Sequence, residues 1–90
     1  MDPEQARRTL ETERERGLAE IAAAGTLAEL DQARVRLLGR RSPWSEVQRS
    51  LGSLPPEARR ELGRLANEVK DELERALEQR RAELQERAED

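Results

Sequence analysis

Apolar residues recur every three or four positions along most of this chain, which is the spacing of one face of an α-helix. The longest series contains Leu62, Leu65, Val69, Leu73, Ala76, Leu77 and Leu84. A second series, near the start, contains Leu10, Leu18, Ile21 and Ala22. A third lies between them and contains Leu27, Leu30, Ala33, Leu37 and Leu38. The pattern predicts three amphipathic helices, each with one narrow apolar stripe.

Local start and stop signals bound the first of these helices. Asp2 is a good N-cap, Pro3 suits the first helical position, and Gln5 completes a capping box. Gly25 is a residue type that commonly ends a helix. These signals predict a helix over about residues 3–24.

The middle of the chain carries two further start signals. Thr26 and Glu29 form a second capping box, and Ser42 followed by Pro43 supplies an N-cap and a first helical residue. A Leu-Pro-Pro sequence then breaks the chain, because each proline forces the residue before it out of the α region. These signals predict the remaining helices, over about residues 27–38, 43–50 and 56–88.

The long helix needs a partner. A helix over residues 56–88 is roughly 50 Å long, and its apolar stripe must be covered. We expect the first helix to cover part of it, antiparallel, with the bend between them. The predicted fold is all-α, an antiparallel helical hairpin or coiled coil with short helices at the bend, in a single domain over residues 1–90. Because the first helix is shorter, we also expect an uncovered end of the stripe and self-association of the chain.

Composition narrows the class further. Of 90 residues, 41% are charged and 34% hydrophobic, and the single aromatic residue is Trp44, so a sheet is not expected. No apolar run approaches the roughly 20 residues of a membrane span. The N-terminus lacks the apolar core of a signal peptide, and the absence of cysteine fits a reducing compartment. We therefore expect a cytoplasmic protein without membrane contact.

Catalysis is not expected from these residue types. The chain has no His, Cys or Tyr and no phosphate-cradling glycine loop. Carboxylate pairs such as Glu11–Glu15 could act as acid and base, but the same spacing is far more often that of a solvated helix face. A metal site would need oxygen ligands alone on convex helices. We expect no catalytic residue, no metal and no cofactor in this chain.

Charge divides the chain into an acidic body and a basic centre. Residues 34–64 contain eight basic and three acidic residues, a net charge of +5, whereas the rest of the chain carries −8. Turn residues concentrate in the same stretch, so we expect the basic patch at a bend, where it suits a polyanion. The alternative is that these arginines solubilise a helical tip and pair with nearby glutamates. The candidate contacts are Arg36, Arg40, Arg41, Arg49, Arg59, Arg60 and Arg64.

Trp44 has two interpretations. It could stack on a nucleobase, or it could fill the space between the short helices at the bend, where other apolar bulk is scarce. We favour the packing role.

Three segments in order resemble a known family. They are Arg34-Val-Arg-Leu-Leu-Gly-Arg-Arg-Ser-Pro-Trp-Ser45, Leu51-Gly-Ser-Leu-Pro-Pro-Glu-Ala-Arg59 and Gly63-Arg-Leu-Ala-Asn-Glu-Val-Lys70. They resemble the N-terminal arm of the bacterial phenylalanyl-tRNA synthetase alpha subunit. That family reads Arg-x-x-aromatic-Leu-Gly-Lys-Lys-Gly-x-Leu-Thr, then Leu-Pro-x-Glu-Glu-Arg, then Gly-x-x-Ile/Leu-Asn-x-x-Lys. The chain departs from this pattern at Leu37, Ser42-Pro43, Trp44 and Ala66, which indicates a repacked bend.

The resemblance implies a function. The family's arm is an antiparallel coiled coil that holds the outer corner of tRNA, where the D and T loops meet, within an α2β2 enzyme. It implies a non-catalytic tRNA-binding arm with the beta subunit as a further partner, and the class II catalytic module is absent from this chain. The arm of seryl-tRNA synthetase is a weaker likeness, because the three segments do not suit it. The alternative from another class is a coiled coil that binds proteins through its stripe and has no role with nucleic acid.

Overall fold

The computed structural model describes residues 1–89, with side chains through residue 87. Its elements are α1 (Pro3–Ala23), α2 (Leu27–Leu38), α3 (Pro43–Ser50), a single 3₁₀ turn η1 (Leu51–Ser53) and α4 (Pro56–Glu89). The side chains of Asp2, Thr26 and Ser42 each accept a hydrogen bond from the backbone N–H three residues ahead. The helices therefore begin and end within one residue of the positions that the local signals predict.

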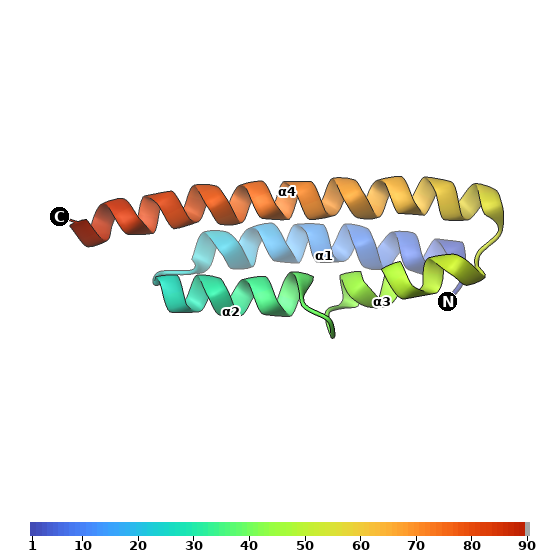
Figure 1. Cartoon of the computed structure of the whole chain (residues 1–90), viewed down its shortest axis with the longest axis horizontal. Coiled ribbons are helices and arrows are strands. Elements are labelled where there is room, and N and C mark those ends of the chain that lie inside the picture. The colour runs from blue at the N-terminus through green and yellow to red at the C-terminus, as the bar shows by residue number, and fades with distance from the viewer. Residues whose placement is uncertain (90) are drawn as a thin grey trace.

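The helices form three legs of an elongated bundle that measures 52 × 19 × 16 Å. α1 runs along the molecule, α2 and α3 together run back, and α4 runs in the direction of α1 (Figure 1). Arg7 pairs with Glu61 and Arg14 pairs with Glu72, so residue numbers rise together along α1 and α4. Between α2 and α4 the order is reversed, as the pairs Asp31–Arg81 and Arg34–Glu74 show.

The predicted fold class is confirmed: the regular elements of residues 1–89 are all helical, and α2–α3 forms an antiparallel hairpin with α4. The expectation that the first helix lies antiparallel to the long helix is wrong. The 12 residues of α2 and eight of α3 together span about 30 Å, which matches the 21 residues of α1. The two short helices are therefore a complete returning leg, and this leg places α1 and α4 in the same direction.

The inward face of α1 also differs from the predicted stripe. Leu10 and Ile21 are buried as expected, but Leu18 is 39% exposed and Ala22 is exposed as well. The other residues of α1 that face inward are Ala6, Glu13 and Gly17. Ala6 and Gly17 on this face let α1 approach its neighbouring legs closely, and Leu18, the residue after Gly17, lies outside.

Gly17 lies where all three legs meet. A Cβ atom at this position would be 2.6 Å from Leu73 Cδ2 of α4 and 3.2 Å from Leu37 Cδ2 of α2. A glycine inside a helix costs roughly 1 kcal/mol relative to alanine. Here the cost has a packing reason, because any side chain would push apart two buried leucines.

The apolar stripe of α4 is covered within the molecule. Its leucines and valine from Leu62 to Leu84 are all buried except Leu65, which is half-buried. α1 covers one side of the stripe and α2–α3 covers the other, so the expected uncovered end is wrong. Self-association was expected because a single covering helix would leave part of the stripe exposed. Since two legs cover the stripe, that reason for self-association no longer applies.

Candidate nucleic-acid interface

The junction between α2 and α3 is held by hydrogen bonds that converge on one carbonyl. The oxygen of Gly39 accepts from the backbone N–H of Ser42 at 3.1 Å, from the Ser42 hydroxyl at 2.8 Å and from the Ser45 hydroxyl at 2.6 Å. Ser42 is only 3% exposed, yet the two residues between it and Gly39, Arg40 and Arg41, are exposed. The junction therefore presents two adjacent arginines on a rigid turn at mid-length of the molecule.

Gly39 is required at this turn by a close approach of backbone to backbone. Its amide donates to the carbonyl oxygen of Val35 at 2.9 Å, which ends α2. A Cβ atom at residue 39 would lie 2.3 Å from the same oxygen, which real side chains do not allow. The conformation that exposes the two arginines thus depends on the missing side chain.

A third arginine is bound to the same turn. The guanidinium of Arg49, on α3, donates through Nη1 to the carbonyl oxygen of Arg40 at 2.8 Å. Arg49 is itself exposed. Its charge therefore lies beside those of Arg40 and Arg41.

Three more candidate arginines project from the first turns of α4. Arg59, Arg60 and Arg64 are all exposed. The indole N–H of Trp44 donates to the carbonyl oxygen of Ala66 at 2.9 Å, which sets α3 beside this part of α4. Because a helix rises 1.5 Å per residue, Arg60 lies about 9 Å along the axis from that contact.

Ion pairing divides the seven candidate arginines into two groups. Among the described side chains, those of Arg40, Arg41, Arg49, Arg59, Arg60 and Arg64 form no ion pair with a carboxylate. The seventh candidate, Arg36, does: its Nε donates to Glu20 Oε1 at 2.7 Å. The other arginines in ion pairs between helices are Arg7, Arg14, Arg34 and Arg81. The alternative that the basic residues pair with nearby glutamates thus applies to Arg36 but not to the other six candidates.

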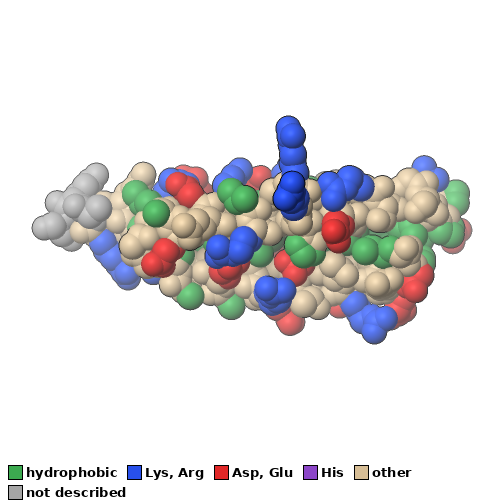
Figure 2. Space-filling model, turned by 90° about the horizontal axis from the view of Figure 1, so that it is seen from below, with side chains coloured by type: hydrophobic (Ala, Val, Ile, Leu, Met, Phe, Trp, Pro, Cys, Tyr) green, Lys and Arg blue, Asp and Glu red, His purple; other side chains and the backbone are tan. Residues whose placement is uncertain are grey.

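The predicted single basic bend is divided between two places. The turn between η1 and α4 lies at the end of the bundle near the N-terminus, whereas the junction between α2 and α3 lies near mid-length (Figure 1). The view onto α2 and α3 shows basic side chains along this face, several of them near its middle, with carboxylates between them (Figure 2). The expectation of one patch at a bend is wrong, because α2–α3 is a full leg and spreads the arginines along it.

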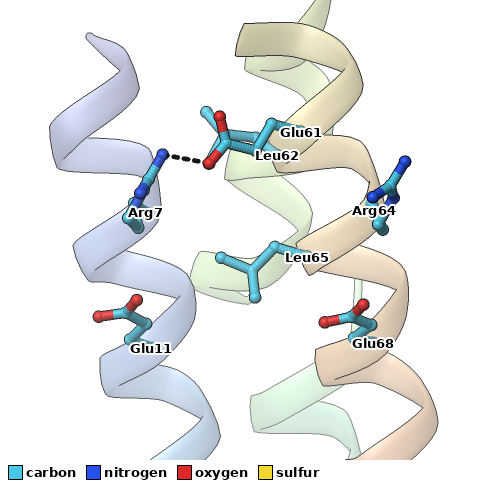
Figure 3. Close-up of a pocket in the computed structure, with 7 residues that line it drawn as sticks. All are labelled: Arg7, Glu11, Glu61, Leu62, Arg64, Leu65 and Glu68. Carbon is cyan, nitrogen blue, oxygen red and sulfur yellow. Dashed lines mark hydrogen bonds and ion pairs between the residues drawn. The ribbon is translucent and has the colours of Figure 1, made fainter.

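The groove between α1 and α4 has the opposite character. Its lining contains three carboxylates and two arginines over a floor of Leu62 and Leu65; the charged residues are Glu11, Glu61, Glu68, Arg7 and the candidate contact Arg64. Arg7 is paired with Glu61 at 2.6 Å, and Arg64 points away from that pair (Figure 3). Three carboxylates make this groove unfavourable for a polyanion, so a nucleic acid would approach the faces formed by α2 and α3.

Trp44 is a packing residue, as predicted. It is 9% exposed, and its only polar atom is satisfied by the carbonyl of Ala66. The ammonium of Lys70 lies 5.9 Å from the centroid of the ring. Lys70 lies outside residues 34–64 and so is not among the predicted contacts; its sequence signal is that it is the sole lysine and stands at the lysine position of the third family segment.

Two features are not found in the described part of the chain. No group of three or more acidic side chains converges so as to hold a metal ion. Within the same residues, none of the helices combines the length and apolarity needed to cross a bilayer.

Comparison with known proteins identifies the family. The family model described as "Aminoacyl tRNA synthetase class II, N-terminal domain" matches residues 25–90, which include α2, α3 and α4. The chain belongs to this family. The match contains both the Arg40–Arg41 turn and the arginines of α4.

Curated relatives agree with the recognised resemblance to phenylalanyl-tRNA synthetase. The phenylalanine–tRNA ligase alpha subunit of Methylococcus capsulatus is 54% identical over 37 residues, which are 41% of this chain and 11% of that protein. The same subunit of Enterococcus faecalis is 48% identical over 48 residues, 53% of this chain and 14% of that protein. The alpha subunit of Moorella thermoacetica is 48% identical over 44 residues, which are 49% of this chain and 13% of that protein. The chain thus matches only a small part of the length of these relatives.

Proposed function

We propose that this chain is a non-catalytic tRNA-binding arm of a phenylalanine–tRNA ligase alpha subunit. In this role it positions tRNA for aminoacylation, and it contributes neither a catalytic residue nor a cofactor site. The family match and the names of the relatives support a role in the synthetase. The observation that carries the tRNA contact is that six exposed arginines without a carboxylate partner among the described side chains gather within residues 40–64, at the turn between α2 and α3, on α3 and at the start of α4.

The chemistry of these arginines suits folded RNA. RNA helices are recognised largely through their backbone and shape, and arginine side chains contact phosphates. A hydrogen-bonded turn presents Arg40 and Arg41, so little backbone order has to be gained on binding. Arg49, Arg59, Arg60 and Arg64 extend the contact along α3 and the start of α4. The outer corner of tRNA, where the D and T loops meet, is the proposed ligand.

The same proposal implies which protein the complete alpha subunit would assemble with. The beta subunit of an α2β2 enzyme is the proposed protein partner of the complete alpha subunit. The proposal also places the chain in the cytoplasm, where tRNA is aminoacylated. The alternative, a coiled coil that binds proteins through its stripe, loses its support because the stripe is buried inside the bundle.

A titration of the isolated chain with tRNA at two salt concentrations tests the proposal. With three or four phosphates neutralised at once, the logarithm of affinity should fall with the logarithm of salt with a slope of about −3. Because the acidic parts of the chain repel RNA, the dissociation constant should be on the order of 10⁻⁴–10⁻⁶ M, as for non-specific association. No binding at low salt would contradict the proposal. Adenylate formation from ATP and phenylalanine by this chain alone would contradict the non-catalytic role.

A further inference from the structure

The space between α2 and α4 contains a cation held against an aromatic ring. Trp44 is fixed in orientation, because its indole N–H donates to the carbonyl oxygen of Ala66 at 2.9 Å. The ammonium of Lys70, one turn further along α4, lies 5.9 Å from the ring centroid. This distance is within the range of a cation–π contact, which is weak for a half-exposed lysine and leaves the ammonium free to take a stronger partner.

Lys70 has no carboxylate partner among the described side chains. The carboxylate one helical turn further along the same helix is that of Glu74, and the structure pairs it with Arg34 of α2 at 3.9 Å. Lys70 thus differs from Arg34, Arg36 and Arg81, which are all engaged by carboxylates. Like the arginines of the proposed interface, Lys70 carries a positive charge that no described carboxylate neutralises.

Lys70 also lies next to the turn that presents those arginines. A groove of about 330 Å³ separates α2 from α4, and its lining includes Gly39, Trp44 and Lys70. Gly39 immediately precedes Arg40, so one end of the groove opens beside that residue, whereas Arg41 lines the groove between α1 and α2. Glu74 and the Arg34 that it binds also line this groove, so the ammonium of Lys70 is the one unpaired charge among its described lining residues. The groove between α1 and α2 contains two such carboxylates, Glu13 and Glu20, with the arginines that they bind.

We propose that the groove between α2 and α4 is a phosphate site, with Lys70 as its binding residue. On binding, the ammonium turns from the ring of Trp44 to a phosphate oxygen, while Arg40 and Arg49 contact the adjoining backbone. This inference rests on the proposed tRNA contact and deepens it, because it commits the RNA to the α4 side of the α2–α3 leg. Trp44 then has a second role, since its ring holds the unbound lysine in place.

The first test compares neutral variants of matched charge. Lys70→Gln should weaken tRNA binding at low salt by roughly fivefold and reduce the salt slope by about 0.9, the contribution of one phosphate contact. Arg75→Gln removes one charge from an exposed site five residues further along α4 and should change neither value. Lys70→Arg should restore the salt slope. Thermal unfolding of each variant shows whether a loss of binding arises from a loss of fold.

The second test uses Trp44, the only tryptophan, as a reporter. Inorganic polyphosphate does not absorb where tryptophan is excited, and adding it should change the emission of the natural protein as the ammonium leaves the ring. In Lys70→Gln this change should be absent, whereas in Arg75→Gln it should persist. An emission that stays constant on saturation with polyphosphate would overturn the inference.

The outcomes separate this inference from the proposed function. If the natural protein binds no tRNA, the proposed function fails and the phosphate site fails with it. If tRNA binds, and a double variant of Arg40 and Arg41 loses affinity while a folded Lys70→Gln does not, only the groove is excluded. Loss in both variants with unchanged unfolding temperature of Lys70→Gln supports the two together.

Discussion

Replacing Gly39 by alanine should damage the turn on which the proposed interface depends. The new Cβ atom would lie 2.3 Å from the carbonyl oxygen of Val35, whereas ordinary contacts begin at 3.4 Å. The Cβ position is fixed by the backbone of residue 39, and the oxygen belongs to the backbone of Val35. No flexible side chain can therefore move aside to relieve the contact. The main chain must shift by about 1 Å, and it is held by hydrogen bonds on both sides.

The expected magnitude follows from those bonds. The amide of Gly39 donates to Val35, and its carbonyl oxygen accepts from Ser42 twice and from Ser45 once. A net contribution of about 1 kcal/mol for each bond, with two or three disturbed, gives a loss of about 2–3 kcal/mol. For a chain of this size, that loss lowers Tm by about 10–20 °C.

Thermal unfolding followed by circular dichroism measures the effect, and Gly52→Ala is the matched control. A Cβ atom at Gly52 meets nothing within 4 Å, and no glycine of residues 1–89 has a positive φ. Gly52→Ala should therefore raise stability by about 0.4–1 kcal/mol, through the lower entropy of the unfolded chain. Equal Tm values for the two variants would refute the reasoning.

Three further predictions concern packing. Trp44→Ala should cost about 3 kcal/mol in a denaturant titration, and native emission should be blue-shifted; emission like that of free tryptophan would contradict its burial. Gly17→Ala should destabilise by about 1 kcal/mol, because overpacking against Leu37 and Leu73 outweighs the gain in helix propensity; a more stable variant would show that these leucines yield. Sedimentation should find a monomer at high protein concentration, because both sides of the α4 stripe are covered, and a concentration-dependent dimer would contradict this.

Local signals predicted the helices well because each depends on few neighbouring residues. Asp2, Thr26 and Ser42 cap their helices with their own side chains, so their effect does not require a partner far along the chain. The direction of α1 relative to α4 depends instead on the summed length of α2 and α3. From the sequence, α2 and α3 are expected to be two short helices at a bend. They form a full leg of the bundle only because they pack end to end along one line.

The candidate site was predicted in composition but not in arrangement. The charge of residues 34–64 identified six arginines that the structure leaves without a carboxylate partner, but it could not separate them from Arg36. That distinction depends on Glu20, which is distant in sequence and meets Arg36 only because α1 and α2 are antiparallel. The roles of Gly17 and Gly39 were also hidden, because each is set by atoms that approach from another turn or another helix.

The control for a test of the interface must be chosen from the structure. Arg80 and Arg81 are unsuited, because Arg80 donates to the carbonyl oxygen of Ala24 and Arg81 pairs with Asp31, so their loss would disturb the fold. Two arginines in the second half of α4 are exposed and have no carboxylate partner among the described side chains. They are Arg75 and Arg87.

The most direct test of the proposed function is tRNA binding by two double variants of equal charge. Arg40→Gln with Arg41→Gln should weaken binding at low salt by roughly tenfold or more and reduce the salt slope by about 2. Arg75→Gln with Arg87→Gln should leave affinity within about twofold of the natural chain, because these residues contact no phosphate in the proposed complex. Equal losses in the two variants would contradict the account, since the turn between α2 and α3 would then contribute only net charge.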